Sequence, residues 1–339
     1  MQPKSPQYIT TTPAPRSLSP VPSLCDIAFM GGGVRGIGFA GAINSLENSG
    51  YKIRRAVGVS AGAIAAAAVI AGFSGQELKK ELLSLDYNRF KKKDYVPIGL
   101  VRDYINLRTD LGVFSADEFE NWFSSLLAKK GVKTFGDLGQ DSDKKLKVTA
   151  ANIVTKKLLV LPDDLKLFGI DYKKFSIATA VRMSMSIPLF YEPYKLVDNK
   201  GNTHLIVDGG IFCNYPIWLL DDGCQKLKVP VFGVKFIECQ SHEPKKLAKV
   251  FKVTDYLKTV LAAAIDASGH GYSRVTRGDS ERTINISVCV DNKTIASTDF
   301  NLNQQIASTL FNNGEKAAKE FLKNWDFKQW QETRMRNEK

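Results

Sequence analysis

The feature that most constrains the fold is a pattern that occurs twice near the start of the sequence. In each copy a short apolar run leads into a turn that contains glycine, and a helix of small residues follows. The first copy is CDIAFM (25–30) with GGGVRGIGFAGAINSLENSG (31–50), and the second is RRAVGVS (54–60) with the alanine-rich stretch that ends at Gly72. Repeated strand, turn and helix predict a parallel sheet with helices on both faces. We therefore expect an α/β fold in three layers, with a mainly parallel central sheet flanked by helices.

A single domain is expected over residues 26–325, because no internal repeat or linker interrupts this range. Residues 1–25 are rich in proline, serine and threonine and predict a flexible tail, and residues 326–339 predict a polar tail. With 339 residues, of which 44% are hydrophobic, the chain is long enough to bury a substantial core.

Local signals predict several later elements. Residues 114–131 have the pattern of an amphipathic helix, with Ser115 as its N-cap, Glu118 as the capping-box partner and Gly131 as its stop. A pair of helices is expected to close the domain at 303–325.

Charge and cysteine content limit the environment of the protein. The net charge of +12 favours anionic partners, without choosing between acidic lipid headgroups and nucleic acid. An odd number of cysteines with no CxxC pair argues against a disulfide framework or a zinc site, so we expect all of them to be structural or incidental in a reducing compartment. These five are Cys25, Cys213, Cys224, Cys239 and Cys289.

The sequence shows no signal peptide, because the N-terminus lacks a basic region followed by an apolar core. Residues 56–73 carry no charge, but they are mostly alanine and glycine and fit a buried strand, turn and helix better than a bilayer crossing. The expected location is cytoplasmic, either free or at a membrane surface, and delivery into another cell stays an open alternative.

The second turn holds a serine between two glycines, Gly58-Val59-Ser60-Ala61-Gly62. A sharp strand-to-helix turn with this G-x-S-x-G pattern presents a nucleophilic serine, and side chains at 58 and 62 would collide with the neighbouring backbone. The turn also places Ser60 at the N-terminus of the next helix, whose dipole favours developing negative charge. Ser60 is therefore the candidate nucleophile, with Gly58 and Gly62 forming its elbow.

The first turn allows two interpretations. Gly31, Gly33 and Gly36 match the G-x-G-x-x-G pattern of dinucleotide-binding folds, but no acidic residue follows at the end of the second strand to hold a ribose. Arg54 and Arg55 could face an NADP phosphate, yet they lie at the wrong end of that strand. Consecutive glycines also let backbone amides converge on an oxyanion beside a helix N-terminus, and we prefer this second interpretation.

The proton acceptor for Ser60 is the open question, because the chain has only three histidines. Ser60, Asp208 and either His242 or His270 satisfy the Ser–acid–His order of α/β-hydrolases, but both histidines lie in polar stretches typical of exposed loops. His204 is on the strand that contains Asp208, four residues before it and too far away to reach the same site. Asp208 itself ends a buried strand, at the sheet edge where α/β proteins bind ligands.

Three motifs in this order resemble those of the patatin-like phospholipase family, and AVRMSMSIPLFYEP resembles the stretch that precedes its D-G-G strand. The resemblance spans about 26–237, the expected catalytic core, and extends more loosely to 325. The motifs are a glycine-rich oxyanion loop with an internal basic residue (Gly31, Gly32, Gly33, Val34, Arg35, Gly36), the G-x-S-x-G elbow (Gly58, Ser60, Gly62) and a D-G-G turn (Asp208, Gly209, Gly210).

The resemblance implies a patatin-like three-layer fold and a Ser–Asp dyad that hydrolyses phospholipids or related lipids through an acyl-enzyme. In that scheme Ser60 is the nucleophile and Asp208 the general base and then acid, while amides around Gly32, Gly33 and Val34 stabilise the oxyanion. Neither a metal nor a cofactor is implied. The expected partners are a lipid ester and, transiently, an anionic membrane surface, with no nucleic acid. The oligomeric state stays open.

The segment after the elbow helix offers a candidate membrane contact. Lysines alternate there with large apolar residues, which could form a basic, partly apolar surface, a solvated helix face or a lid over the site. The residues are Lys79, Lys80, Lys91, Lys92, Lys93, Leu78, Leu82, Leu83, Tyr87 and Phe90.

Two other functions remain open besides nucleotide binding. One is an α/β-hydrolase with a histidine base and a small soluble ester substrate. The other is a lipid-binding protein that uses the same fold without catalysis.

Overall fold

The computed structural model describes residues 24–91, 111–221, 223, 226–239, 253–271, 278–299 and 302–337. Its strands are β1 (Leu24–Phe29), β2 (Lys52–Val59), β3 (Gly112–Phe114), β4 (Leu146–Asn152), β5 (Lys157–Leu161), β6 (Leu189–Tyr191), β7 (Tyr194–Val197), β8 (Thr203–Asp208), β9 (Val231–Ile237), β10 (Thr283–Ser287), β11 (Cys289–Val290) and β12 (Lys293–Thr294).

The α-helices of the described ranges are α1 (Ile37–Asn48), α2 (Ala61–Ile70), α3 (Gly75–Leu83), α5 (Asp117–Ala128), α6 (Ser142–Lys145), α7 (Ile177–Met185), α8 (Val253–Gly271), α9 (Gln304–Lys323) and α10 (Phe327–Asn337). Short 3-10 turns that matter for the site are η1 (Gly33–Gly36), η2 (Tyr87–Lys91) and η6 (Gly209–Ile211).

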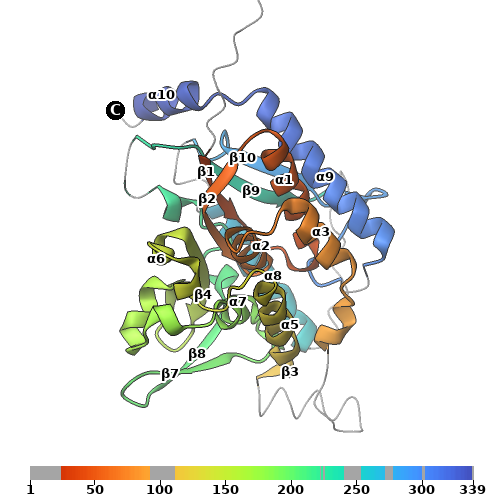
Figure 1. Cartoon of the computed structure of the whole chain (residues 1–339). Coiled ribbons are helices and arrows are strands. Elements are labelled where there is room, and N and C mark those ends of the chain that lie inside the picture. The colour runs from red at the N-terminus through yellow and green to blue at the C-terminus, as the bar shows by residue number, and fades with distance from the viewer. Residues whose placement is uncertain are drawn as a thin grey trace, which may run out of the picture.

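An eight-stranded sheet with the order β10-β9-β1-β2-β4-β8-β7 organises the domain, and β5 pairs with β4 off this path (Figure 1). β10, β9, β1, β2 and β4 run parallel, whereas β8, β7 and β5 are antiparallel to their partners. In β1 every residue after Leu24 is buried, which means that both faces of the strand are covered. The predicted α/β fold, with a mainly parallel sheet flanked by helices, is confirmed.

Helices α1 and α9 pack so closely that glycine is required at their contact. A Cβ atom at Gly314 would lie 2.0 Å from the carbonyl oxygen of Gly38, and one at Gly41 would lie 2.0 Å from that of Phe311. The contact requires α9 to continue through Gly314, although glycine lowers helix propensity. The expected pair of helices at 303–325 is therefore wrong, since α9 fills almost all of this range as one helix.

A second helix does follow, but it lies in the stretch predicted as a polar tail. Residues 327–337 form α10, and Trp330 of this helix is only 6% exposed. The indole packs at a tilted angle against Trp325 and donates a hydrogen bond to the Gly278 carbonyl oxygen. Trp330 thus belongs to the hydrophobic core, and Phe327 packs against that core.

The predicted cap of α5 is also wrong. Ala116 is the N-cap and its side chain makes no capping bond, while the Ser115 hydroxyl accepts a hydrogen bond from the Asp117 amide instead. Acidic residues in the first turn, Asp117 and Glu118 among them, favour the positive end of the helix dipole without a side-chain cap. Gly131 adopts the left-handed conformation, with φ of +71°, just past the end of the helix.

The cysteine pattern argues against a disulfide framework, but Cys239 and Cys289 form a disulfide. The sheet register explains the pairing. Ile237 of β9 lies level with Ser287 of the parallel strand β10, so the residues two positions further on are neighbours as well. A separation of 50 residues gives no sign of this proximity in the sequence. Cys25 and Cys213 are free and buried, and position 224 lies outside the described residues.

Candidate active site

Ser60 lies in the turn between β2 and α2, in a backbone conformation that is rare for a residue with a side chain. Its φ is +54° and its ψ is −125°, and the residue is 5% exposed. The chain crosses itself closely at this turn. A Cβ atom at Gly58 would lie 2.1 Å from the Gly62 carbonyl oxygen, and one at Gly62 would lie 2.5 Å from that of Met30. The two glycines therefore permit the turn that presents the Ser60 hydroxyl.

Asp208 ends β8 and lies level with Ala150 of β4, which brings its carboxylate to the same edge of the sheet as Ser60. The Ser60 side chain is hydrogen-bonded to this carboxylate, and the Gly210 amide donates to its Oδ1 over 2.7 Å. Burial raises the pKa of Asp208 from 3.8 to about 6, although both hydrogen bonds act in the opposite direction. At neutral pH the group is thus an ionised carboxylate and a far better proton acceptor than an exposed aspartate.

The glycine loop lies beside Ser60, but only part of it has amides that are available to a ligand. Gly31 donates its amide hydrogen to the Asn214 carbonyl oxygen over 3.1 Å, and Val34 donates to that of Ser297 over 3.0 Å. The amides of Gly32 and Gly33 have no hydrogen-bond acceptor within the described part of the chain. The Val34 amide is therefore not available as an oxyanion donor, because its hydrogen bond to Ser297 fixes the loop.

Two serines in the stretch before Pro188 position the backbones of Ser60 and Asp208. The Ser60 amide donates to the Ser184 hydroxyl over 2.8 Å, and the Asp208 amide donates to the Ser186 carbonyl oxygen over 2.9 Å. Both serines are fully buried. The motif AVRMSMSIPLFYEP contains both serines but does not reveal these roles, since only the folded chain shows which backbone groups they meet.

His204, whose side chain the structure describes, does not reach the nucleophile. The His204 ring lies 3.2 Å from the Asn152 side-chain nitrogen and 3.4 Å from Asp198, and it lines neither cavity at Ser60. His270 belongs to the last turn of α8, which corrects its predicted place in a loop, and its side chain lies outside the described part. Position 242 also lies outside the described residues.

The arginines considered for nucleotide binding have another role. Arg54 and Arg55 both bind the carboxylate of Asp26, each with a closest distance of 2.7 Å, and the Asp26 side chain is fully buried. This ion cluster joins β1 to β2 and leaves neither arginine directed at the glycine loop.

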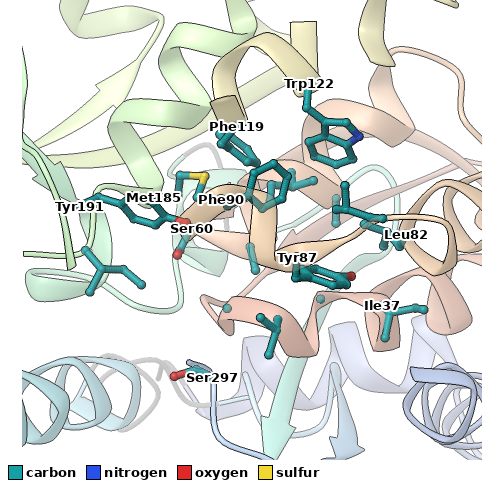
Figure 2. A pocket seen from close by; sticks show the side chains of 18 of the residues that line it. Ile37, Ser60, Leu82, Tyr87, Phe90, Phe119, Trp122, Met185, Tyr191 and Ser297 are labelled. Carbon is teal, nitrogen blue, oxygen red and sulfur yellow. The ribbon is translucent and has the colours of Figure 1, made fainter. Parts of the chain in front are cut away.

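Ser60 lies where two cavities of different character meet. The first, of about 70 Å³, is enclosed mainly by apolar side chains of α2, α3, η2, α5 and α7 (Figure 2). Its large lining residues include Leu78, Leu82, Leu85, Tyr87, Phe90, Phe119, Trp122, Met185, Ile187 and Tyr191. The second, of about 610 Å³, is more polar and lies between the glycine loop and α8; its lining includes Gly32, Arg35, Asp208, Asn214, Glu238 and Asp266.

The first cavity changes the interpretation of the lysine-rich segment. Leu78, Leu82 and Phe90 are buried against the site, so they form a cavity wall rather than an exposed membrane-binding face. Lys79 lies over the Phe311 ring at 4.0 Å, and positions 92 and 93 lie outside the described residues.

The described residues contain neither a metal-binding cluster nor a helix able to span a membrane. No group of three or more His, Cys, Asp and Glu side chains there has an arrangement that could hold a metal ion. In the same ranges, no helix combines the length and the hydropathy that a membrane span requires.

Comparison with known proteins identifies the family. The family model for patatin-like phospholipases matches residues 27–221. The uncharacterized protein YqhO of Bacillus subtilis (strain 168) is 36% identical over 305 residues, covering 89% of this chain and 99% of that protein. The probable lipid hydrolase 463L of Invertebrate iridescent virus 6 is 26% identical over 195 residues, covering 56% of this chain and 61% of that protein.

Among solved structures, VipD from Legionella pneumophila is similar with a TM-score of 0.53 at 18% identity, covering 89% of this chain and 67% of that one. At this level of identity the likeness shows a common fold and nothing more. The family model, in contrast, covers more than half of the chain, and this protein therefore belongs to the patatin-like phospholipase family.

Proposed function

We propose that this protein hydrolyses carboxylic ester bonds of phospholipids or related lipids through an acyl-enzyme on Ser60, with Asp208 as the general base. Family membership and the likeness to a probable lipid hydrolase support lipid hydrolysis. The observation that carries the finer proposal is the hydrogen bond between Ser60 and the buried carboxylate of Asp208, at the junction of an apolar and a polar cavity.

The first half-reaction transfers the acyl group to the enzyme. The Ser60 oxygen attacks the ester carbonyl carbon while its proton moves to Asp208. The oxygen of the tetrahedral intermediate takes the negative charge, which the amides of Gly32 and Gly33 stabilise; one such donor contributes about 3 kcal/mol. The intermediate then collapses, the bond to the alcohol breaks, and Asp208 returns the proton to the leaving alcohol oxygen.

The second half-reaction restores the enzyme. A water molecule gives its proton to Asp208 and attacks the acyl carbon, and the new intermediate expels the Ser60 oxygen. Asp208 then protonates Ser60, and the carboxylic acid leaves. One carboxylate serves both halves because burial places its pKa near 6, within reach of proton transfer in either direction at neutral pH.

The different polarity of the two cavities determines the orientation of the bound ester. Burial of an acyl chain in the apolar cavity is favourable by about 0.8 kcal/mol for each methylene. The alcohol part of the ester then lies in the larger polar cavity, which Arg35 lines together with Glu238 and Asp266. This arrangement supports a phospholipase A or lysophospholipase reaction over hydrolysis of a small soluble ester.

Product analysis on mixed phospholipids tests the proposal. We expect the wild-type protein to release free fatty acid and the matching lysophospholipid or glycerophosphoryl product, as seen by mass spectrometry. The Ser60→Ala variant should release neither, because it lacks the attacking oxygen. If the folded wild-type protein binds phospholipid vesicles but yields no products, the non-catalytic lipid-binding alternative is correct instead.

The proposal also locates the contact with a lipid surface, at α8 rather than at the lysine-rich segment. This helix lines the polar cavity through residues such as Thr259 and Ile265. Along the same helix Tyr256, Leu257 and Val260 are 58%, 42% and 48% exposed. Large apolar side chains exposed beside a substrate entrance are typical of membrane contact.

Replacing Leu257 and Val260 together with serine should weaken binding to vesicles of phosphatidylcholine and phosphatidylglycerol by about tenfold, because two partly buried aliphatic contacts are lost. Hydrolysis of a soluble short-chain ester should not change. Leu167→Ser is the matched control, since Leu167 is 64% exposed and lines neither cavity. Equal losses of vesicle binding in both variants, measured by co-sedimentation, would count against α8 as the contact.

A further inference from the structure

One polar group in the apolar cavity has no hydrogen-bond partner in the described structure. Tyr191, at the end of β6, is 1% exposed, and its hydroxyl oxygen is buried without a donor or acceptor among the described residues. A buried hydroxyl without a partner destabilises the folded state, so such groups usually serve a ligand or a bound water molecule. Burial also raises the pKa of the Tyr191 phenol well above its ordinary value, so the group stays protonated and can donate.

The Tyr191 side chain lines the same cavity as the reacting serine. Tyr191, Met185 and Ser60 all line this cavity, and Figure 2 shows the Tyr191 ring extending toward Ser60. The ring itself is fixed by its neighbours. Phe190 packs edge-on against it at 4.8 Å, and the backbone of Tyr191 pairs with Phe114 of β3. The donor is thus held in place before any substrate enters.

An unbranched hydrocarbon chain offers no hydrogen-bond acceptor to the Tyr191 hydroxyl. In the free enzyme a water molecule can accept a hydrogen bond from the phenol, but a chain of methylenes that enters the cavity displaces the water and offers no acceptor. A chain with an oxygen atom near the ester replaces the water and its hydrogen bond. Sites built to bond a substrate hydroxyl discriminate strongly against analogues that lack it.

We propose that the Tyr191 hydroxyl makes this enzyme selective for esters whose acyl chain carries a hydrogen-bond acceptor, a hydroxyl or keto oxygen, close to the carbonyl carbon. The inference rests on the proposed function, because it assumes that the apolar cavity holds the acyl chain. Tyr191 acts here as a specificity-determining residue, whereas the chemistry of ester cleavage stays with Ser60 and Asp208.

The test compares p-nitrophenyl esters of decanoic acid and of its α-hydroxy and β-hydroxy derivatives, which share a leaving group and a chain length. For the wild-type protein we expect kcat/KM to be at least about tenfold higher with one of the hydroxy esters than with the plain ester. Tyr191→Phe, which removes one oxygen atom and keeps the ring, should abolish this preference by lowering kcat/KM for the hydroxy esters to that for the plain ester. Tyr51→Phe removes a buried hydroxyl outside both cavities and should change neither rate.

The outcomes separate the two proposals. Equal rates of wild-type protein with all three esters would overturn the selectivity and leave the hydrolase function standing. An equal loss with every ester in Tyr191→Phe would also overturn it, since the hydroxyl would then serve the reacting carbonyl group. No hydrolysis of any ester or phospholipid by the folded wild-type protein would overturn the proposed function and this inference with it.

Discussion

The Asp208→Asn variant is expected to lose at least about 10³-fold in kcat/KM for lipid esters while Ser60 and both cavities stay in place. Asparagine has nearly the same size as aspartate and can still form a hydrogen bond with the Ser60 hydroxyl. Its amide, however, cannot accept the proton that Ser60 must release. The rate with a chromogenic ester measures the loss, and retention of more than a tenth of the wild-type rate would contradict the role of Asp208 as base.

The pH dependence of the free energy of unfolding shows whether the Asp208→Asn variant is correctly folded. Burial raises the pKa of Asp208 to about 6, against 3.8 in the unfolded chain, so the folded state binds this proton more tightly. The stabilisation from the group is fully present below pH 3.8 and is lost as the pH rises through 6. Asparagine stays neutral, so the variant should be more stable than the wild type by about 1–3 kcal/mol at about pH 8 and no more stable at about pH 4.

The same titration sets the pH dependence of the wild-type reaction. Only the carboxylate form of Asp208 accepts a proton, so kcat/KM should rise with pH, reach half its maximum near pH 6 and level off above it. A variant that loses both activity and stability at high pH would show that Asp208→Asn damages the fold, and the loss of rate would then say nothing in favour of a base.

The largest expected effect on stability is at Asp221, outside the site. Its carboxylate binds both terminal nitrogens of Arg282, over 2.6 and 2.9 Å, and Arg334 of α10 lies 3.4 Å away. The Arg282 side chain is 1% exposed and its Nε also donates to Asp279. Both guanidinium groups lie near the ring of Trp330, at 5.3 and 5.5 Å from its centre. The cluster thus joins β10 and α10 to the chain after β8.

Asp221→Ala should lower the free energy of unfolding by about 3–5 kcal/mol, because it removes a carboxylate that binds two buried arginines. Urea unfolding followed by circular dichroism measures the change. The matched control is Glu320→Ala on α9, which removes an exposed partner of Lys316 and should cost less than about 1 kcal/mol. Similar losses in the free energy of unfolding for the two variants would show that the buried Asp221 cluster does not stabilise the fold more than an exposed ion pair.

The sequence was sufficient to predict those parts of the site whose geometry is local. The turns at Gly31 and Ser60 each follow an apolar strand and precede a helix within a few residues. Their backbone conformations therefore depend on residues that are neighbours in the sequence. The place of Asp208 beside Ser60 depends on how β8 pairs with β4, more than 140 residues after the elbow. Local patterns do not contain that register, and the prediction of this pair relied on the resemblance between motifs.

The errors share a physical cause. Leu78 and Leu82 lie on α3, but the pattern of an amphipathic helix does not say whether its apolar side meets a membrane or a neighbouring cavity. The partner of Cys239 was equally hidden, because the α8 crossover lies between the two cysteines. The missing donor at Val34 was not predictable either, since its acceptor, Ser297, comes from a distant loop.

The account depends on one claim, that a carboxylate and not an imidazole takes the proton of the nucleophile. Fluorophosphonate labelling of Ser60, mapped by peptide mass spectrometry, tests it in Asp208→Asn and in a variant with His204→Asn, His242→Gln and His270→Gln. The account predicts that the histidine variant reacts at the wild-type rate and that Asp208→Asn hardly reacts. Full reaction of Asp208→Asn, with no reaction of a folded histidine variant, would contradict it.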